Sequence, residues 1–375
     1  MRSALFEDLF VLELANNHWG NLDRGLKIIC DFAQVATFNN VKAAIKLQFR
    51  DVDTFVHKDH RGRQDVRYIK KTLATQMPWD NLKTMVSAVR DAGFVSMVTP
   101  FDETSVDKCV EFGVQVLKLA SSDIRDRFLI EKIASAGKPV IASTGGSSLK
   151  DMDDLVEYFN GRNIPFAINH CVSIYPSTDA ELELNQVDFL RDRYPDNVIG
   201  FSTHECTDWR FSVMMAYAKG ARTFERHIDI DHEGVAVSPY CTLPEQADQW
   251  FKAFKKAQEM CGAPGTAKRI PPEKEIRYLD ELVRGVYAKR DLPAGHVLSE
   301  GDVYLAVPLL KGQLSCRELM KGEVLRAPLD KDAPIHIGDI DSPYSENSEL
   351  QRVINARGVD AEWEPSAPLR MVASN

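Results

Sequence analysis

Residues 197–228 read NVIGFSTHECTDWRFSVMMAYAKGARTFERHI, and the arrangement within this stretch decides the fold. A short β-branched run, NVIGF, leads into polar residues that include His204, and a second run, ARTFE, leads to His227. The residues between the two runs suit a helix. Strand, helix and strand in this order favour parallel pairing of the strands through a right-handed crossover. We therefore expect the two histidines at the C-terminal ends of adjacent parallel strands.

Six further runs of the same kind precede this stretch: FVLELANN from Phe10, AAIKLQF from Ala43, FVSMVTPF from Phe94, VQVLKLASS from Val114, PVIASTGG from Pro139 and PFAINHCVS from Pro165. Helical apolar spacing separates them, as in LKTMVSAVRDAG from Leu82, which ends on Gly93 as a C-capped helix would. Eight such units over about 250 residues predict an α/β fold, a closed (β/α)8 TIM barrel. A Rossmann sheet would need GxGxxG after its first strand, where ANNHWG stands.

The composition changes after the barrel units, which occupy residues 1–262. Residues 263–281 are rich in proline, glycine and charge and are expected to form a linker. Residues 282–341 show short alternating runs and turn signals without a long helix, which predicts a small β-rich domain. Residues 342–375 are polar and lack a sustained period, so we expect an extended C-terminal tail.

Composition excludes several classes of function. The chain has 375 residues, 44% of them hydrophobic, and a formal net charge of -9 without a basic stripe, which argues against a nucleic-acid partner. No apolar run reaches the roughly 20 residues of a membrane span, and the N-terminus lacks signal-peptide order. The seven cysteines show no CxxC spacing, which argues against a disulfide framework. We expect a cytoplasmic protein without membrane attachment.

Polar residues stand at the predicted end of every barrel strand, and such residues are costly inside a strand unless they are used. In a parallel barrel these ends converge on one mouth, where active sites lie. The set consists of Glu13, Asn17 and His18; Lys46 and Gln48; Thr99 and Asp102; Lys118, Ser121 and Asp123; Ser143 and Thr144; His170 and Ser173; Ser202 and His204; Glu225 and His227.

Two groups of residues within this set indicate which ligands the site could bind. The ammonium groups of Lys46 and Lys118, with nearby hydroxyls, suit an anionic ligand such as a phosphate; the alternative is a pair of ion-paired barrel lysines beside ordinary turn serines. His204 and His227 suit a borderline divalent metal ion, although a lone histidine is more often a satisfied polar residue than a ligand. The sequence HECTD is not HExxH, so a metalloprotease is not indicated.

In their order and spacing the motifs ELANNHWG, AIKLQ, VTPFD, KLASSD, ASTGG, HCVSIYP, GFSTHE and FERH resemble those of the sialic acid synthases. No single motif would carry this resemblance. That family joins an N-terminal barrel to a C-terminal antifreeze-like (SAF) domain, and KRDLPAGHVLSEGDV is similar to the opening of the latter. The similarity runs from about Phe10 to Ile340.

The resemblance implies an enzyme that condenses phosphoenolpyruvate with a sugar aldehyde, such as N-acetylmannosamine, to give a 2-keto-3-deoxy sugar acid and phosphate. It implies a divalent metal on His204 and His227, Mn²⁺ first and Mg²⁺ or Co²⁺ as alternatives. It implies catalytic carboxyl groups at Glu13 and Asp123. The implied phosphoenolpyruvate site comprises Lys46, Gln48, Thr99, Lys118, Ser121, Ser143, Ser173 and Ser202, and the implied acceptor site comprises Asn17, Tyr175 and Tyr240.

In the implied mechanism the metal polarises the aldehyde, so that C3 of the enol phosphate can attack it. Water then adds at C2, phosphate leaves, and a carboxylate manages the protons. The resemblance also implies a homodimer in which the SAF domain of one chain covers the barrel mouth of the other.

Four departures from the family pattern bear on the acceptor. Asp123 replaces a glutamate, Ser173 replaces a longer polar residue, and the segment SPYC places Tyr240 and Cys241 where an acid and a histidine are usual. The loop VPLLKGQLS lacks the family's arginine and leaves Lys311 as the nearby cation. These changes predict an altered acceptor and leave two other hypotheses open, a non-catalytic sugar-phosphate binding protein and a class II metal-dependent pyruvate aldolase.

Overall fold

The structure is a computed structural model that describes residues 3–232, 234–318 and 322–362. The chain divides into two compact units, with the division between Gly262 and Ala263. No helix in the described ranges is long and apolar enough to cross a membrane.

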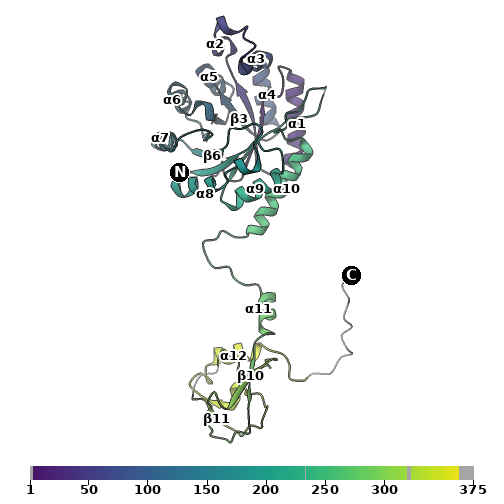
Figure 1. Ribbon diagram of the computed structural model, residues 1–375, viewed down its shortest axis with the longest axis vertical. Coiled ribbons are helices and arrows are strands. Elements are labelled where there is room, and N and C mark those ends of the chain that lie inside the picture. The colour runs from purple at the N-terminus through teal and green to yellow at the C-terminus, as the bar shows by residue number, and fades with distance from the viewer. Residues whose placement is uncertain (1–2, 233, 319–321, 363–375) are drawn as a thin grey trace. The chain divides into compact units, whose positions relative to one another are not determined.

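Eight parallel strands close into a barrel in chain order, which confirms the predicted (β/α)8 fold (Figure 1). Each overlaps one of the runs from which it was predicted, and β1 begins one residue before its run, at Leu9. The strands are β1 (Leu9–Ala15), β2 (Ala43–Phe49), β3 (Val95–Pro100), β4 (Val116–Leu119), β5 (Val140–Ser143), β6 (Phe166–Cys171), β7 (Val198–Ser202) and β8 (Thr223–His227).

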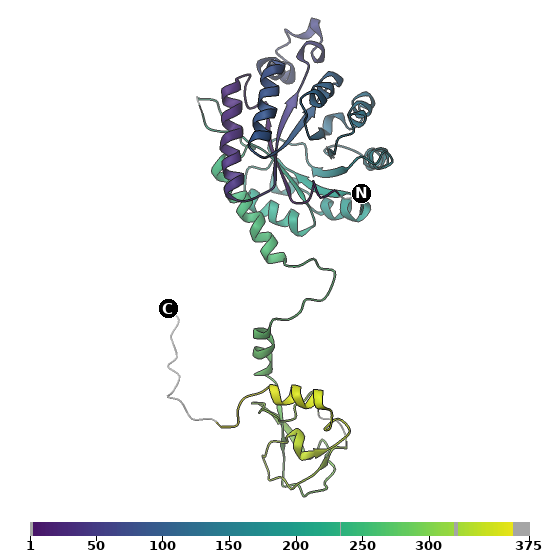
Figure 2. The ribbon, with the colours of Figure 1, turned by 180° about the vertical axis from the view of Figure 1, so that it is seen from behind.

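Helices follow the strands and ring the barrel, as the view from behind also shows (Figure 2). They are α1 (Leu22–Phe38), α4 (Trp79–Asp91), α5 (Glu103–Glu111), α6 (Arg127–Ser135), α7 (Leu149–Asn160), α8 (Asn185–Arg193), α9 (Trp209–Ala218) and α10 (Pro244–Cys261). Gly93 has a φ of 83° just after α4, which confirms its expected place beyond the helix C-terminus. Between β2 and α4 the chain inserts α2 (Val52–Phe55), a 3-10 turn (Lys58–His60) and α3 (Arg67–Ala74).

The barrel interior changes from apolar to polar along the strands. Side chains alternate between the two faces of a strand, so every second residue points inward. One end is filled by a buried apolar cluster that includes Phe6, Leu9 and Val11. Two positions past Val11 the same face carries Glu13, whose register neighbours are Lys46 on β2 and His227 on β8. The period-two pattern therefore places the polar residues on the inner face at the C-terminal ends of the strands.

The second unit pairs β9 (Gly285–Ala288) with β10 (Val303–Ala306) and β11 (Val324–Leu325) with β12 (Ile340–Asp341), both antiparallel. Its own buried cluster includes Val286, Leu314 and Ile335. This small β-rich unit agrees with the SAF fold expected from the sequence.

Two parts of the second unit differ from the sequence-based expectation. Helix α11 (Glu273–Asp280) lies within the stretch expected as a linker and buries none of its residues. The stretch expected as an extended tail contains α12 (Ser348–Ala356), which buries Ile354 in the cluster of the small unit. Val359 then bridges to Leu310. The helix is two and a half turns long and is fixed by tertiary contacts, which the sequence pattern did not reveal. The remainder of the expected tail, residues 363–375, lies outside the described residues.

Candidate active site

The barrel mouth holds a buried network of two lysines and two glutamates. Lys118 Nζ lies 2.7 Å from Glu225 Oε2, and Lys46 Nζ lies 3.1 Å from Glu225 Oε1 and also pairs with Glu13. Lys46 further donates to Thr99 Oγ1 at 3.1 Å. The sequence analysis left open that these two lysines are ion-paired within the barrel. The structure shows such ion pairs, and both lysines share Glu225 as a partner.

The charges of these four side chains depend on one another, so an anionic ligand can change their pairing. Burial lowers the pKa of Lys46 to about 8, so the ammonium form depends on its carboxylate neighbours. Burial alone would raise the pKa of Glu225, but Lys118 and Lys46 outweigh it and hold this pKa below the ordinary value. An anion entering the mouth can exchange with the carboxylates for the same ammonium groups.

Hydroxyl groups from four strand ends, those of β4, β5, β6 and β7, lie around this network. Ser202 Oγ donates to Glu225 Oε1 at 3.3 Å, and Ser143 is buried at the end of β5. Ser121 Oγ accepts from the backbone N–H of Gly145 at 3.0 Å. A Cβ on Gly145 would lie 2.0 Å from Ser173 Oγ and 2.9 Å from Ser121 Oγ. The glycine thus allows these two hydroxyls to lie close together above the loop after β5.

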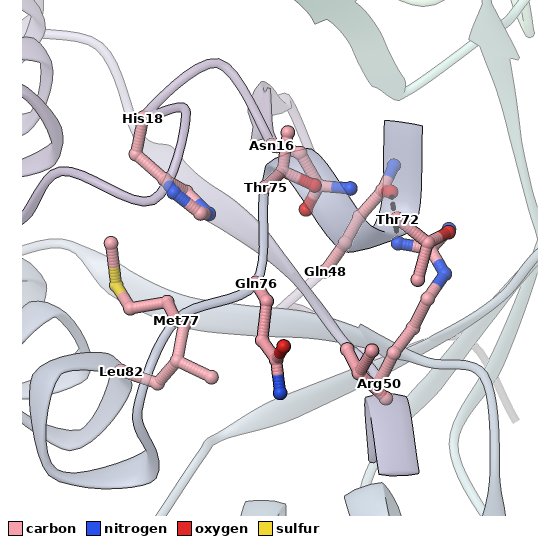
Figure 3. Close-up of a pocket in the computed structure, with 10 residues that line it drawn as sticks. Asn16, His18, Gln48, Arg50, Thr72, Thr75, Gln76, Met77 and Leu82 are labelled. Atoms are coloured by element: carbon pink, nitrogen blue, oxygen red, sulfur yellow. Dashed lines mark hydrogen bonds between the residues drawn. The ribbon is translucent and has the colours of Figure 1, made fainter. Parts of the chain in front are cut away.

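Glu13 is also reached from the end of β2. Gln48 Nε2 donates to Glu13 Oε1 at 2.8 Å, and Arg50 Nη1 donates to Gln48 Oε1 at 3.1 Å. Gln48 and Arg50 line a polar cavity (Figure 3) whose wall also includes Asn16, His18, Thr72, Thr75 and Gln76. The cavity joins the insertion between β2 and α4 to the barrel mouth.

Asp123 lies on the 3-10 turn Ser121–Asp123 after β4 and is half-buried. Its Oδ2 atom is buried and has no hydrogen-bond partner. Burial raises the pKa of Asp123 to about 6. A carboxyl group with a pKa near neutrality can take up and release a proton during turnover, which fits the predicted acid-base role despite the shorter side chain.

The two histidines lie together at the ends of β7 and β8, as predicted, with ring centroids 5.5 Å apart. His204 Nδ1 lies 3.0 Å from the carbonyl oxygen of Val172, an arrangement that leaves Nε2 available to bind a metal. Burial lowers the pKa of His204 to about 4 and that of His227 well below its ordinary value. Both imidazoles are thus neutral at physiological pH, the form that binds metals.

The donor set fits a metal site with two protein ligands and open positions. No group of three or more histidine, cysteine, aspartate or glutamate side chains in the described ranges could hold an ion. The remaining coordination positions would therefore be taken by water or by substrate oxygen atoms. Open positions of this kind are typical of catalytic rather than structural metal sites.

Aromatic rings enclose the histidine pair. The ring of Tyr175 lies 3.9 Å from that of His204, and the ring of Tyr240 lies 5.2 Å from that of His227. Asn17 Nδ2 donates to the carbonyl oxygen of Ile228 at 2.8 Å and contacts Cys241 Sγ at 3.5 Å. The three predicted acceptor residues, Asn17, Tyr175 and Tyr240, thus lie around the same side of the mouth as the histidines. Lys311, in the second unit, pairs with Asp360 at 2.6 Å.

Sequence reasoning assigned no role to two residues that the structure makes prominent. Glu225 was counted among the strand-end residues, but pairing preferences across a barrel cannot be seen along the chain. Arg50 was not counted, because it follows the end of β2 and belongs to no recognised motif. The available signal was its place two residues after Gln48 and four after Lys46, because the period of two continues the inward face past the strand end.

Fold and site together define a (β/α)8 barrel enzyme with its active site at the C-terminal ends of the strands. The family model of the NeuB family matches residues 34–264, and that of the SAF domain matches residues 283–341. The chain belongs to the NeuB family, which confirms the resemblance to the sialic acid synthases.

Individual relatives extend the match along most of the chain. A solved structure of a candidate spore coat polysaccharide biosynthesis protein E from Chromobacterium violaceum is 35% identical, with a TM-score of 0.84, and covers 90% of this chain and 100% of its own. N-acetylneuraminate-9-phosphate synthase of Mus musculus is 26% identical over 77% of this chain and 80% of its own length. N,N'-diacetyllegionaminic acid synthase of Campylobacter jejuni is 23% identical over 79% of this chain and 89% of its own length.

Proposed function

We propose that the protein condenses phosphoenolpyruvate with a sugar aldehyde, forming a 2-keto-3-deoxy sugar acid and releasing phosphate. The observation that carries the proposal is the pair of buried lysines that share Glu225 beside two neutral histidines. The named relatives support it, because they are synthases of N-acetylneuraminate 9-phosphate and of diacetyllegionaminic acid.

In this proposal the anionic groups of phosphoenolpyruvate are held by Lys46 and Lys118, which would give up part of their pairing with Glu225 and Glu13. Charge-assisted hydrogen bonds from buried ammonium groups are strong and suit phosphate oxygens. Further hydrogen bonds would come from Gln48 and from the hydroxyls of Thr99, Ser121, Ser143, Ser173 and Ser202.

We propose that His204 and His227 hold a divalent ion, Mn²⁺ in the first place, with Mg²⁺ and Co²⁺ as alternatives. When bound there, the ion would supply Lewis acidity to the aldehyde oxygen of the acceptor. The neutral state of both imidazoles and the free Nε2 of His204 support this assignment. Asn17, Tyr175 and Tyr240 surround the space beside the histidines and would position the acceptor.

C3 of phosphoenolpyruvate forms a bond to the aldehyde carbon, whose oxygen takes a proton and becomes a hydroxyl group. Water adds at C2 and gives up one proton, which balances the proton taken by the aldehyde oxygen. The C2–O bond to phosphate then breaks, and the new C2 hydroxyl loses its proton, which leaves with the phosphate, so that the keto group forms. Asp123, with a pKa of about 6, suits the role of taking the proton from this water. Glu13, hydrogen-bonded by Gln48 and paired with Lys46, suits proton transfer near the reacting carbons.

The test measures phosphate release from phosphoenolpyruvate with Mn²⁺ and a panel of hexosamine, hexose and pentose acceptors. We expect release with at least one acceptor and a product whose mass equals acceptor plus pyruvate. Lys118→Met should abolish release, whereas Lys132→Met, on the surface of α6, should leave it unchanged. Product formation from pyruvate in place of phosphoenolpyruvate would instead identify an aldolase, and no release with any acceptor would refute the proposal.

We also propose a cytoplasmic homodimer in which each SAF domain covers the partner's barrel mouth. The support is family membership together with a second unit that has its own buried core. Light scattering at micromolar concentration should give twice the chain mass of 42.2 kDa. A monomer would contradict this assembly.

A further inference from the structure

A buried ion pair beside the two histidines has no role in the proposed reaction. Arg226 Nη1 lies 2.8 Å from Glu205 Oε2, and the two side chains are 1% and 0% exposed. Glu205 directly follows His204, and Arg226 directly precedes His227. Charged groups are costly to bury even when they are paired. Stability alone therefore does not account for a pair of this kind next to both candidate metal ligands.

The pair lies on the outer face of the barrel wall, behind the histidines. Side chains alternate between the two faces of a strand, so Arg226 points outward while His227, next to it, points into the mouth. The guanidinium of Arg226 lies 5.5 Å from the centre of the Trp209 ring on α9. Glu205 accepts a hydrogen bond from Ser212, also on α9. The pair is thus enclosed between α9 and the wall formed by β7 and β8, and it does not face a substrate in the mouth.

The contacts of Arg226 cross from one histidine-bearing strand to the other. The register between β7 and β8 ends two residues before His204. Beyond that point, Arg226 Nη2 donates to the backbone carbonyl oxygen of Glu205 at 2.8 Å. This hydrogen bond holds the chain just after His204 against the residue that precedes His227.

A further donor of Arg226 holds the chain beyond His227. Arg226 Nε donates to Thr242 Oγ1 at 2.9 Å, and the backbone N–H of Thr242 donates to the carbonyl oxygen of His227 at 2.8 Å. The planar guanidinium presents its donors in a fixed fork. One rigid side chain therefore sets the separation between the chain after His204 and the chain after His227.

We propose that Glu205 and Arg226 form a positioning pair that fixes the distance and relative orientation of the His204 and His227 rings, so that both imidazoles reach one divalent ion. This inference rests on the proposed metal site and adds to it two residues that never touch the metal. A site with two protein ligands depends on the surrounding protein for the geometry of those ligands. Residues that orient ligands from outside contribute substantially to metal affinity.

The test separates positioning from stability with one double variant. Glu205→Gln and Arg226→Met each leave a buried charge without its partner, so each should lower the urea midpoint of unfolding. Combining the two removes one charge of each sign and should recover most of the midpoint. The double variant still lacks the guanidinium fork. Its affinity for Mn²⁺, measured by calorimetry with the metal alone, should therefore stay roughly 10–100-fold below that of the parent protein.

Leu155→Ala is the matched control for a loss of stability away from the site. Leu155 is a buried residue of α7, the helix after β5, and its truncation leaves a cavity in the core. This variant should lower the urea midpoint and keep the parent affinity for Mn²⁺. Parent affinity in the double variant would overturn the inference, and so would an equally large loss of affinity in Leu155→Ala.

NMR of the metal-free protein with labelled histidines keeps this test separate from the proposed metal site. The two ring centroids are 5.5 Å apart, so the ring protons of His204 and His227 should give a nuclear Overhauser effect in the parent protein and in Leu155→Ala. The effect should be clearly weaker in the double variant. If the parent protein binds no Mn²⁺, the proposed metal assignment fails, whereas this measurement still decides whether the pair sets the spacing of the rings. An unchanged effect in the double variant contradicts the positioning role.

Discussion

Replacing Glu225 by glutamine should destabilise the barrel, because this carboxylate neutralises buried ammonium groups. It lies 2.7 Å from Lys118 and 3.1 Å from Lys46, and the side chains of Lys118 and Glu225 are 2% and 8% exposed. Lys46 would keep Glu13 as a partner, whereas Lys118 would keep no carboxylate among the described residues. Breaking a buried pair by removing one partner costs roughly 3–5 kcal/mol, and we expect Glu225→Gln to fall within this range.

The assay is urea unfolding at neutral pH, followed by the fluorescence of barrel tryptophans such as Trp250. Asp188→Asn is the matched control, because its carboxylate pairs with Lys219 at 2.7 Å but is 37% exposed. A surface pair contributes up to about 1 kcal/mol. Phosphoenolpyruvate should stabilise Glu225→Gln more than the parent protein, since the ligand supplies the missing negative charge. A loss below about 1 kcal/mol, comparable to that of the control, would refute the assigned charge balance.

Three further predictions address the site and the barrel. The pKa of Asp123, about 6, should set the acidic limb of the pH profile of kcat/KM. Activity should fall as the pH drops through this value, because the protonated carboxyl group cannot accept a proton. Asp123→Asn should remove this limb, and a limb retained in the variant would contradict the assignment. Gly200→Ala would place a Cβ 1.7 Å from Thr223 Oγ1. This change should lower the free energy of unfolding, measured from urea midpoints, by at least about 2 kcal/mol. An unchanged midpoint would show that β7 and β8 can separate enough to accommodate the methyl group. His204→Ala should weaken Mn²⁺ binding by more than the roughly 10–100-fold typical of losing an outer-sphere partner, whereas calorimetry on exposed His60→Ala should show parent affinity.

The barrel was predictable because its signals are local and repeated. Each strand is a short apolar run, and the polar residue at its end lies on the inner face by the same alternation that buries Leu9 and Val11. Convergence of the strand ends then follows from parallel closure rather than from any single motif. Glu13, Lys46 and His227 lie in register on three neighbouring strands for this reason.

Contacts between side chains that lie far apart along the chain could not be predicted from the sequence. The contact between Lys118 and Glu225 joins residues 107 positions apart on non-adjacent strands across the barrel. Its formation depends on strand tilt and side-chain length, which no periodicity encodes. Helix α12 was missed for a related reason, because its single buried side chain, Ile354, gains its burial from a cluster formed by distant residues.

The balance of charge at the mouth connects the substrate site to the proton chemistry. Lys46 and Lys118 face Glu13 and Glu225, so the four groups are neutral together before a substrate enters. An anion that draws Lys46 toward itself would weaken the ion pair between Lys46 and Glu13. Gln48 donates to Glu13 and accepts from Arg50, so it connects this carboxylate to a guanidinium group at the edge of the mouth.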